Sequence, residues 1–191
     1  MNRVFVDTNV LFPFSVIDLL LGLSEDGLHS VVWTDALLDE WERVIVREQR
    51  RSPATAASVT TAIREFFADS KIKPAEYEHL IADMPGNDPD DHHHMAAAIA
   101  GHATVLITDN LKDFPADPLA RLGLRVLRPD AYLCELLGDL PDQVTSTIER
   151  IAAEKRNPPR STADVLDALQ NAGLNAFTQL ARRRLEPPSG T

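Results

Sequence analysis

Two acidic clusters separated by an alanine-rich segment are the residues of this sequence best suited to bind a cation. The first cluster precedes the segment HHHMAAAIAGHA and consists of Asp88, Asp90 and Asp91. The second follows the apolar run 104–108 and consists of Asp109 and Asp113. The alanine-rich segment predicts a helix and the apolar run a strand, so the carboxylates lie at a helix start and just past a strand end. Carboxylate oxygens are ligands of hard divalent cations, and this arrangement predicts a cation site in an α/β domain.

Two further acids occupy comparable positions in the first forty residues. Asp7 directly follows a short apolar run, and Glu40 lies in the second turn of a helix that follows the second predicted strand. Ligands of an open parallel sheet bind beyond the carboxyl ends of its strands. Carboxylates gathered at that edge repel one another and raise each other's pKa values. Mg²⁺ or Mn²⁺, which prefers oxygen ligands, would remove the conflict.

Each of these acids also has a purely structural interpretation. Asp7 and Asp91 can cap or charge a helix N-terminus, Glu40 can be a surface residue, and Asp113 can end a turn. Taken singly, these roles are the more common ones, and we assign such roles to Asp88, Asp90 and Asp117. Taken together, they do not explain why Asp7, Glu40, Asp91 and Asp109 or Asp113 follow successive strand ends.

The histidine run 92–94 is expected to be a bystander. Consecutive helical residues point about 100° apart, so the three imidazoles cannot share one ion. No cysteine lies nearby to complete a zinc site. One histidine close to a metal ion could still contact substrate.

The elements that position these acids alternate between strands and helices. Four runs predict strands of a parallel sheet: Arg3–Val6, His29–Trp33, Thr104–Thr108 and Leu124–Leu127. The first is apolar without alternation, which is typical of a strand buried on both faces. Helices are expected from Ser15 to Gly27 and from Thr34 to about Arg50. Two successive helices before residue 84, the second from Pro74 to Met84, predict an inserted hairpin or flap. From Pro129 onward the chain is expected to be helical.

One flank of the helix from Thr34 to about Arg50 combines Glu40 with basic residues. At 100° per residue the flank contains Arg43, Arg47, Arg50 and Arg51. This pattern fits a solvated charged face, and it equally fits a phosphate-binding stripe beside a catalytic acid.

The length, net charge and cysteine content of the chain limit the classes of protein to which it can belong. The 191 residues predict one domain with a small appendage. A formal charge of −10 argues against a surface that binds nucleic acid everywhere, but not against an enzyme that binds phosphates through metal ions. No secretory signal or membrane span is evident. The single cysteine, Cys134, fits buried packing in a reducing cytoplasm, where we expect the protein to act.

Four motifs together resemble the PIN domain, and within that family the VapC toxins of bacterial toxin–antitoxin pairs. They are VDTNVLF, the glutamate after the second strand, DDHHHMAAAIAGHA and VLITDNLKDF. The resemblance covers roughly residues 1–133. It implies a three-layer α/β/α sandwich with a parallel sheet of four to five strands, and Mg²⁺- or Mn²⁺-dependent endoribonuclease activity.

The resemblance also implies a role for individual residues. The family's acids fall on Asp7, Glu40 and Asp91, and Asn110 stands where many relatives have the fourth acid. That fourth acid is therefore Asp109 or Asp113. Asp7 and Asp91 are expected to be the principal metal ligands, while Glu40 and the fourth acid complete the site directly or through water. The residues expected to orient Asp7 or contact substrate are Thr8, Asn9, Arg43 and Arg47.

This interpretation divides the chain into three parts. They are a nuclease domain (1–133), a C-terminal helical extension (134–186) and a disordered tail (187–191). The extension can pack on the domain, bind an antitoxin or form a homodimer. The expected partners are an RNA substrate and a small antitoxin protein, with no membrane.

Two rival functions remain open at this point. One is a PIN-fold module that binds a partner without cutting RNA. The other is an aspartyl-phosphate phosphohydrolase of the haloacid-dehalogenase type with Asp7 as the nucleophile. That chemistry requires a second aspartate two residues further on, where this chain has Asn9.

Overall fold

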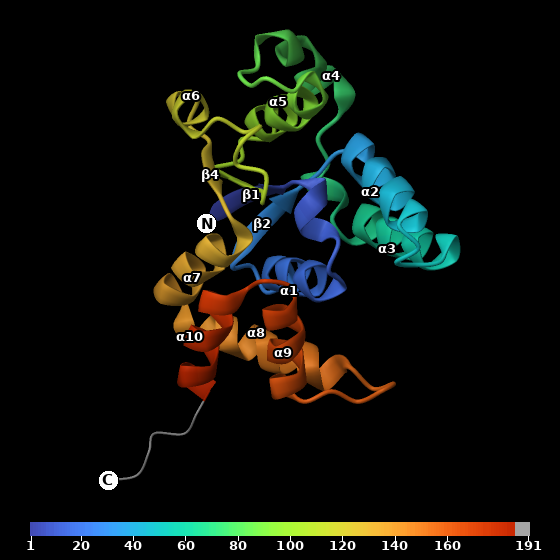
Figure 1. Cartoon of the computed structure of the whole chain (residues 1–191), viewed down its shortest axis with the longest axis vertical. Helices are drawn as coiled ribbons and strands as arrows, with labels where there is room; N and C mark the ends of the chain where they lie inside the picture. Colours follow the sequence, from blue (N-terminus) through green and yellow to red (C-terminus); the bar gives the residue numbers. More distant parts are fainter. Residues whose placement is uncertain (186–191) are drawn as a thin grey trace. The chain divides into compact units, whose positions relative to one another are not determined.

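The computed structural model describes residues 1–185, which form two compact units (Figure 1). The sheet unit comprises Met1–Phe12 and Ser30–Leu127, and the helical unit comprises Pro13–His29 and the chain from Arg128 onward. The predicted domain boundary after residue 133 stays a prediction. The tail predicted to be disordered, 187–191, lies outside the described residues.

A four-stranded sheet forms the centre of the sheet unit. Its strands, in the order β2-β1-β3-β4, are β1 (Asn2–Val6), β2 (His29–Val32), β3 (Val105–Ile107) and β4 (Arg125–Leu127). Val4 lies opposite Val105 in the parallel β1–β3 pair, and Leu106 lies opposite Val126 in the parallel β3–β4 pair. Phe5 and Leu106 are completely buried, which explains why these runs show no alternation. The predicted α/β class with a parallel sheet is confirmed.

Helices connect the strands of the sheet unit. The α-helices are α2 (Asp35–Arg47), α3 (Pro53–Phe66), α4 (Pro74–Tyr77), α5 (His92–Ala100) and α6 (Ala116–Arg121). The 3-10 helices are η1 (Thr8–Leu11), η2 (Ala68–Ser70), η3 (Glu78–Asp83) and η4 (Pro89–Asp91). The segment predicted as one helix from Pro74 to Met84 is a single α-helical turn followed by η3. Helices α2 and α3 lie side by side (Figure 1).

Two local features fix the helices that support the site. Thr34 caps α2, because its hydroxyl accepts a hydrogen bond from the Leu37 amide at 3.0 Å. Trp41 anchors the same helix by donating to the Leu11 carbonyl at 2.8 Å. Helix α5 ends at Gly101, where a Cβ atom would lie only 2.4 Å from Cδ1 of Ile72. Only glycine allows this close approach.

The helical unit consists of five helices. They are α1 (Phe14–Glu25), α7 (Pro129–Asp139), α8 (Pro141–Glu154), α9 (Thr162–Asn171) and α10 (Asn175–Leu185). Helix α1 packs against α8 and α9, and α10 packs against α7. The fully buried residues include Leu23, Leu133, Ile148, Leu169 and Phe177. The C-terminal helices therefore build a core with α1, which comes from the first 133 residues. Within residues 1–185, no helix is long and apolar enough to cross a membrane.

Candidate active site

Asp7 is held in place by two strands. Its amide donates to the Ile107 carbonyl at 2.9 Å, which continues the β1–β3 pairing by one residue. Its carboxylate oxygen Oδ2 accepts hydrogen bonds from Asn9 Nδ2 at 2.6 Å and from Thr108 Oγ1 at 2.7 Å. The carboxylate forms no capping bond to η1, so the structural interpretation of Asp7 as a cap does not apply.

The carboxyl group of Asp7 is buried, which is unusual for an acidic side chain. The residue is only 4% exposed, and this burial raises the pKa of its carboxyl group above 3.8. The electrostatic interaction of Asp7 with His94 opposes that increase in the pKa. Thr8, in η1 beside it, is buried as well. The carboxylate therefore lies where a cation would be bound strongly.

Glu40, on α2, is in contact with the histidine run. Oε2 of Glu40 lies 3.1 Å from Nε2 of His94 and 3.9 Å from Nε2 of His93. The hydrogen bond from His94 is the main reason that the pKa of Glu40 lies below its usual value. His94 is 2% exposed and its ring packs against Phe5, with 5.8 Å between the ring centroids. The histidine run was expected to be a bystander, apart from one histidine that could lie close to a metal ion, and His94 is the histidine that contacts Glu40.

A signal for this contact exists in the sequence. Asp91 and His94 are three residues apart, and residues at that spacing share a face of a helix. If Asp91 faces the acidic site, His94 must face it too. His92, one residue on from Asp91, instead lies with its Nε2 3.2 Å from the Gly86 carbonyl oxygen.

Asp91 precedes α5, but its side chain forms no capping hydrogen bond. Instead its carboxylate meets two others, because single oxygens of Asp88, Asp91 and Asp113 lie within 4.8 Å of one another. Burial, followed by the negative charge of Asp7, raises the pKa of Asp91 from 3.8 to about 6. The charges of Asp88 and Asp113 raise it further. Asp88, to which the sequence analysis gave a structural role, is thus part of the cluster, although it also accepts a bond from the Asp90 amide at 3.0 Å.

Asp113 and Asp109 differ in position. Asp113 lies beside Asp91 and accepts a hydrogen bond from Asn110 Nδ2 at 2.7 Å. Asp109 is exposed, and its amide donates to Asn9 Oδ1 at 3.2 Å. In the described part of the chain, Asp109 belongs to no group of potential metal ligands. The geometry thus favours Asp113 as the fourth acid.

Gly86 allows the two acidic loops to approach each other. Its φ of +124° lies in a region that disfavours L side chains. A Cβ atom at this position would lie 3.0 Å from the Asp113 carbonyl oxygen and 3.3 Å from the Met95 side chain. Glycine here lets the segment that carries Asp88 pass close to the segment that carries Asp113.

The two arginines expected to contact substrate lie at different places. Arg43 lines a depression of about 840 Å³ together with Glu40, Asp91, His93 and neighbouring residues. Its Nε atom donates to the Asp39 carbonyl at 3.3 Å. Arg43 is therefore placed to meet a phosphate that approaches the acids.

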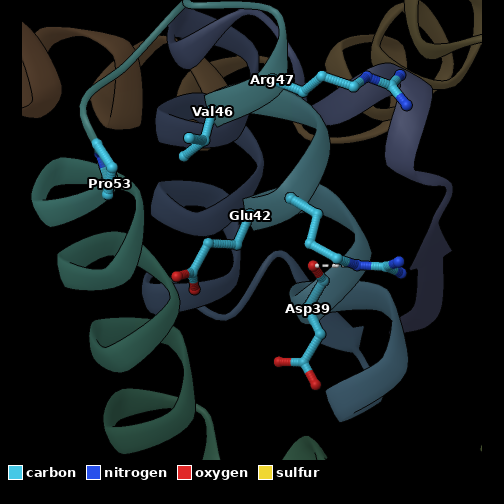
Figure 2. A pocket seen from close by; sticks show the side chains of 6 residues that line it. Asp39, Glu42, Val46, Arg47 and Pro53 are labelled. Carbon is cyan, nitrogen blue, oxygen red and sulfur yellow. Dashed lines mark hydrogen bonds between the residues drawn. The ribbon is translucent and has the colours of Figure 1, made fainter.

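Arg47 lies one turn further along α2. Its side chain is 73% exposed and pairs with Glu48 at 3.3 Å. Figure 2 shows a second depression, in which Glu42 and Val46 extend from α2 toward α3 while Arg47 points away. Helix α2 ends at Arg47 and not near Arg50 as predicted, so Arg50 and Arg51 lie beyond the helical stripe.

The residues present fit a hard divalent cation. Within residues 1–185, no lysine or arginine forms an ion pair with Asp7, Asp88, Asp91 or Asp113. Mutual repulsion and burial have instead raised the pKa of Asp91. A divalent cation bound by oxygen ligands would neutralise this cluster.

Residues 3–112, more than half of the chain, match the PIN domain family, and the protein belongs to that family. Residues 129–183 match a second family, described as VapC50 C-terminal domain. The protein is similar to "Putative ribonuclease VapC50" of Mycobacterium tuberculosis (strain ATCC 25618 / H37Rv), with 35% identity over 115 residues. That alignment covers 60% of this chain and 66% of the relative, slightly under two thirds of its length. No solved structure matches the chain.

Proposed function

We propose that the protein is a Mg²⁺- or Mn²⁺-dependent endoribonuclease and the toxin of a toxin–antitoxin pair. The observation that carries this proposal is that Asp88, Asp91 and Asp113 meet at the start of α5 without a lysine or arginine partner among the described residues, and that the charge of Asp7, at the end of β1, acts on Asp91. The PIN domain match and the ribonuclease named among the relatives support the same reaction class.

In this proposal Asp7, Asp91 and Asp113 hold the cation, and Glu40 completes the site through water. The ion, when bound, polarises the phosphodiester and lowers the pKa of a bound water. Asn9 and Thr108 orient the Asp7 carboxylate through their hydrogen bonds to Oδ2. Such fixed orientation matters because small misplacements of a reactive group reduce rates strongly.

Glu40 acts on the attacking water. Its lowered pKa keeps it ionised at neutral pH, so it can accept a hydrogen bond or a proton from that water. His94 holds Oε2 at 3.1 Å and thereby fixes the carboxylate. Arg43, at the rim of the depression, pairs with the RNA backbone as a charge-assisted donor. In the reaction water oxygen bonds to phosphorus, the bond from phosphorus to the leaving oxygen breaks, and that oxygen takes up a proton.

The geometry around Asp7 speaks against the phosphohydrolase alternative. That chemistry needs an acid two residues after the nucleophile, and Asn9 at this position donates a hydrogen bond to Asp7. An amide donor in that place orients a ligand carboxylate but cannot serve as a general acid.

The proposal is tested by comparing Asp91→Asn with the wild-type protein on an RNA pool. The wild type is expected to cleave with Mg²⁺ or Mn²⁺ and to stop in excess EDTA. Asp91→Asn removes one ligand charge, and we expect the rate to fall at least about tenfold, since even loss of an outer-sphere partner costs that much. The matched control is Asp167→Asn on α9, whose carboxylate is 65% exposed and pairs with Arg182 at 2.6 Å.

Two outcomes contradict the nuclease proposal. Asp91→Asn could cleave as fast as the wild type, or the metal-loaded wild type could leave every RNA pool intact. The second outcome would favour the partner-binding module. For the toxin role, expression of the wild type should arrest growth, Asp7→Asn should not, and a small neighbouring antitoxin should relieve the arrest.

A further inference from the structure

One carboxylate and two imidazoles meet beside the acidic cluster. Oε2 of Glu40 lies 3.1 Å from Nε2 of His94 and 3.9 Å from Nε2 of His93. Potential ligand atoms of all three residues lie within 4.8 Å of one another. This set differs from Asp88, Asp91 and Asp113 in chemistry, since two of its three donors are nitrogen atoms.

The two histidines are consecutive, yet their ring tips converge. Their ring centroids lie 3.9 Å apart with an angle of 38° between the ring planes. The side chains of α5 thus compensate for the 100° step between neighbouring helical positions. Because α2 supplies Glu40 from outside the helix, both Nε2 atoms reach the same oxygen.

The separations suit a bound ion. Around a tetrahedral centre with bonds of about 2.0–2.1 Å, ligand atoms lie about 3.3 Å apart. The observed separations of 3.1 and 3.9 Å lie on either side of this value. The His93 side chain is 29% exposed, and a shift of its Nε2 toward Glu40 would bring it into range of the same ion.

We propose that Glu40, His93 and His94 form a second cation position that takes a transition-metal ion such as Zn²⁺ or Co²⁺ in preference to Mg²⁺. Imidazole nitrogen suits transition metals, whereas Mg²⁺ requires oxygen ligands and retains its water. The ion takes the place of the hydrogen bond between His94 Nε2 and Glu40 Oε2. The proposal concerns binding and does not depend on RNA cleavage.

Two features limit the affinity of this position. Nδ1 of His94 is buried without a hydrogen-bond partner among the described residues, so it lacks the acceptor that usually orients a metal-bound imidazole. The position also lies in the first turn of α5, whose positive end disfavours cations. The charges of Glu40, Asp90 and Asp91 compensate for this effect. The expected site is therefore exchangeable and is not needed for folding.

Co²⁺ is a suitable probe because its visible absorption reports on the ligand set. The full-length protein is titrated with Co²⁺ in millimolar Mg²⁺. We expect Mg²⁺ to displace the ion at the carboxylate cluster and to leave one Co²⁺ per chain, with the absorption of a nitrogen-containing site. His93→Ala should weaken this retained Co²⁺ at least about tenfold. The control, His92→Ala, removes the neighbouring imidazole, which bonds Gly86, and should bind Co²⁺ as the wild type does.

His93→Ala is the primary variant because His94 is almost fully buried, and its replacement could impair folding. A second measurement tests direct ligation without any variant. On addition of Zn²⁺, the ¹⁵N signals of the His93 and His94 rings should shift, while those of the exposed His79 should not. Complete displacement of Co²⁺ by Mg²⁺, wild-type affinity in His93→Ala, or unchanged His93 and His94 signals would each overturn the proposal. None of these results would affect the nuclease proposal.

Discussion

The two units differ in the partners of their carboxylates. In the helical unit the carboxylates are neutralised or hydrogen-bonded: Asp18 by Lys155, Asp26 by Arg150, Asp167 by Arg182, and Asp130 by the amides of Ala176 and Phe177. In the sheet unit the acids at the end of β1 and around α5 face one another. The same side chain stabilises the fold in one unit and opposes it in the other.

Helix α2 shows the contrast within a few residues. Lys71, by its hydrogen bond to Asp35, lowers the pKa of that carboxyl group, and Arg64 contacts both Asp35 and Asp39. Within residues 1–185, Glu40 pairs with no lysine or arginine; it meets His94 and His93, and Thr8 interacts with it as well. Carboxylates that lie close together without a basic partner destabilise the folded protein. Such destabilisation is typical of ligand-binding sites.

The largest expected effect separates the two candidates for the fourth acid. Asp113→Asn should reduce the cleavage rate at least about tenfold at limiting Mn²⁺, because Asp113 lies beside Asp91. Asp109→Asn, in the same loop but outside that cluster, should retain most of the activity. The cleavage rates of both variants are measured as initial rates on the same fluorescent RNA. The reverse order of effects would assign the fourth position to Asp109.

The next effect concerns the unfolding of the sheet unit. A cation at 100 times its dissociation constant should stabilise the folded protein by about 2.7 kcal/mol. Thermal unfolding with Mn²⁺ and with EDTA measures the difference. The stabilisation by Mn²⁺ should disappear in Asp91→Asn and persist in Asp167→Asn. Equal stabilisation of both variants would place the ion elsewhere.

In the helical unit, Asp130→Ala should destabilise the protein by about 1–2 kcal/mol. Its carboxylate accepts from two amides in the first turn of α10, at 3.0 and 2.8 Å, and loss of such a cap typically costs about this much. Urea unfolding provides the measurement. Cleavage per folded molecule should not change, and a specific loss of activity would show that the contrast between the units is too simple.

The smallest effect is a pH dependence of stability in EDTA. The pKa of Asp91 in the folded protein is raised to about 6, from an ordinary value of 3.8. Its protonation therefore favours the folded state fully below about pH 4, and this contribution is lost as the pH rises through about 6. Solvent screening reduces the effect to about 1 kcal/mol. At pH 8 in EDTA, Asp91→Asn should unfold at a higher temperature than the wild type, and at pH 4 the difference should vanish. A variant less stable than the wild type at pH 8 would contradict the raised pKa.

Strands β1 and β3 could be predicted from the sequence because the buried residues of each form a continuous apolar run. Strand β4 is less buried, and its Arg125 is exposed. The cap at Thr34 and the helix after Asp91 were predictable for a similar reason, since local residue types determine them. The end of α2 was not. It is set by Gln49, whose φ of 54° stops the helix, and glutamine gives no signal of such a conformation.

The carboxylates of the candidate site could be proposed from the sequence, but the contacts among its side chains could not. The pairing of His94 with Glu40 joins residues 54 positions apart and depends on how closely α5 approaches α2. The choice between Asp109 and Asp113 depends on the loop around Asn110, whose side chain binds Asp113. Spacing alone cannot distinguish two acids in one turn.

Gly86 offers a way to disable the cluster without altering its charge. A methyl group there would push against the Asp113 carbonyl oxygen. The positive φ of residue 86 disfavours any residue with a side chain, so the backbone could not easily adjust. Gly86→Ala should therefore widen the separation of Asp88 and Asp113 while every acid remains present. Such a variant would keep the electrostatic surface of the parent, and it would separate the effect of the carboxylates' positions from the effect of their charge.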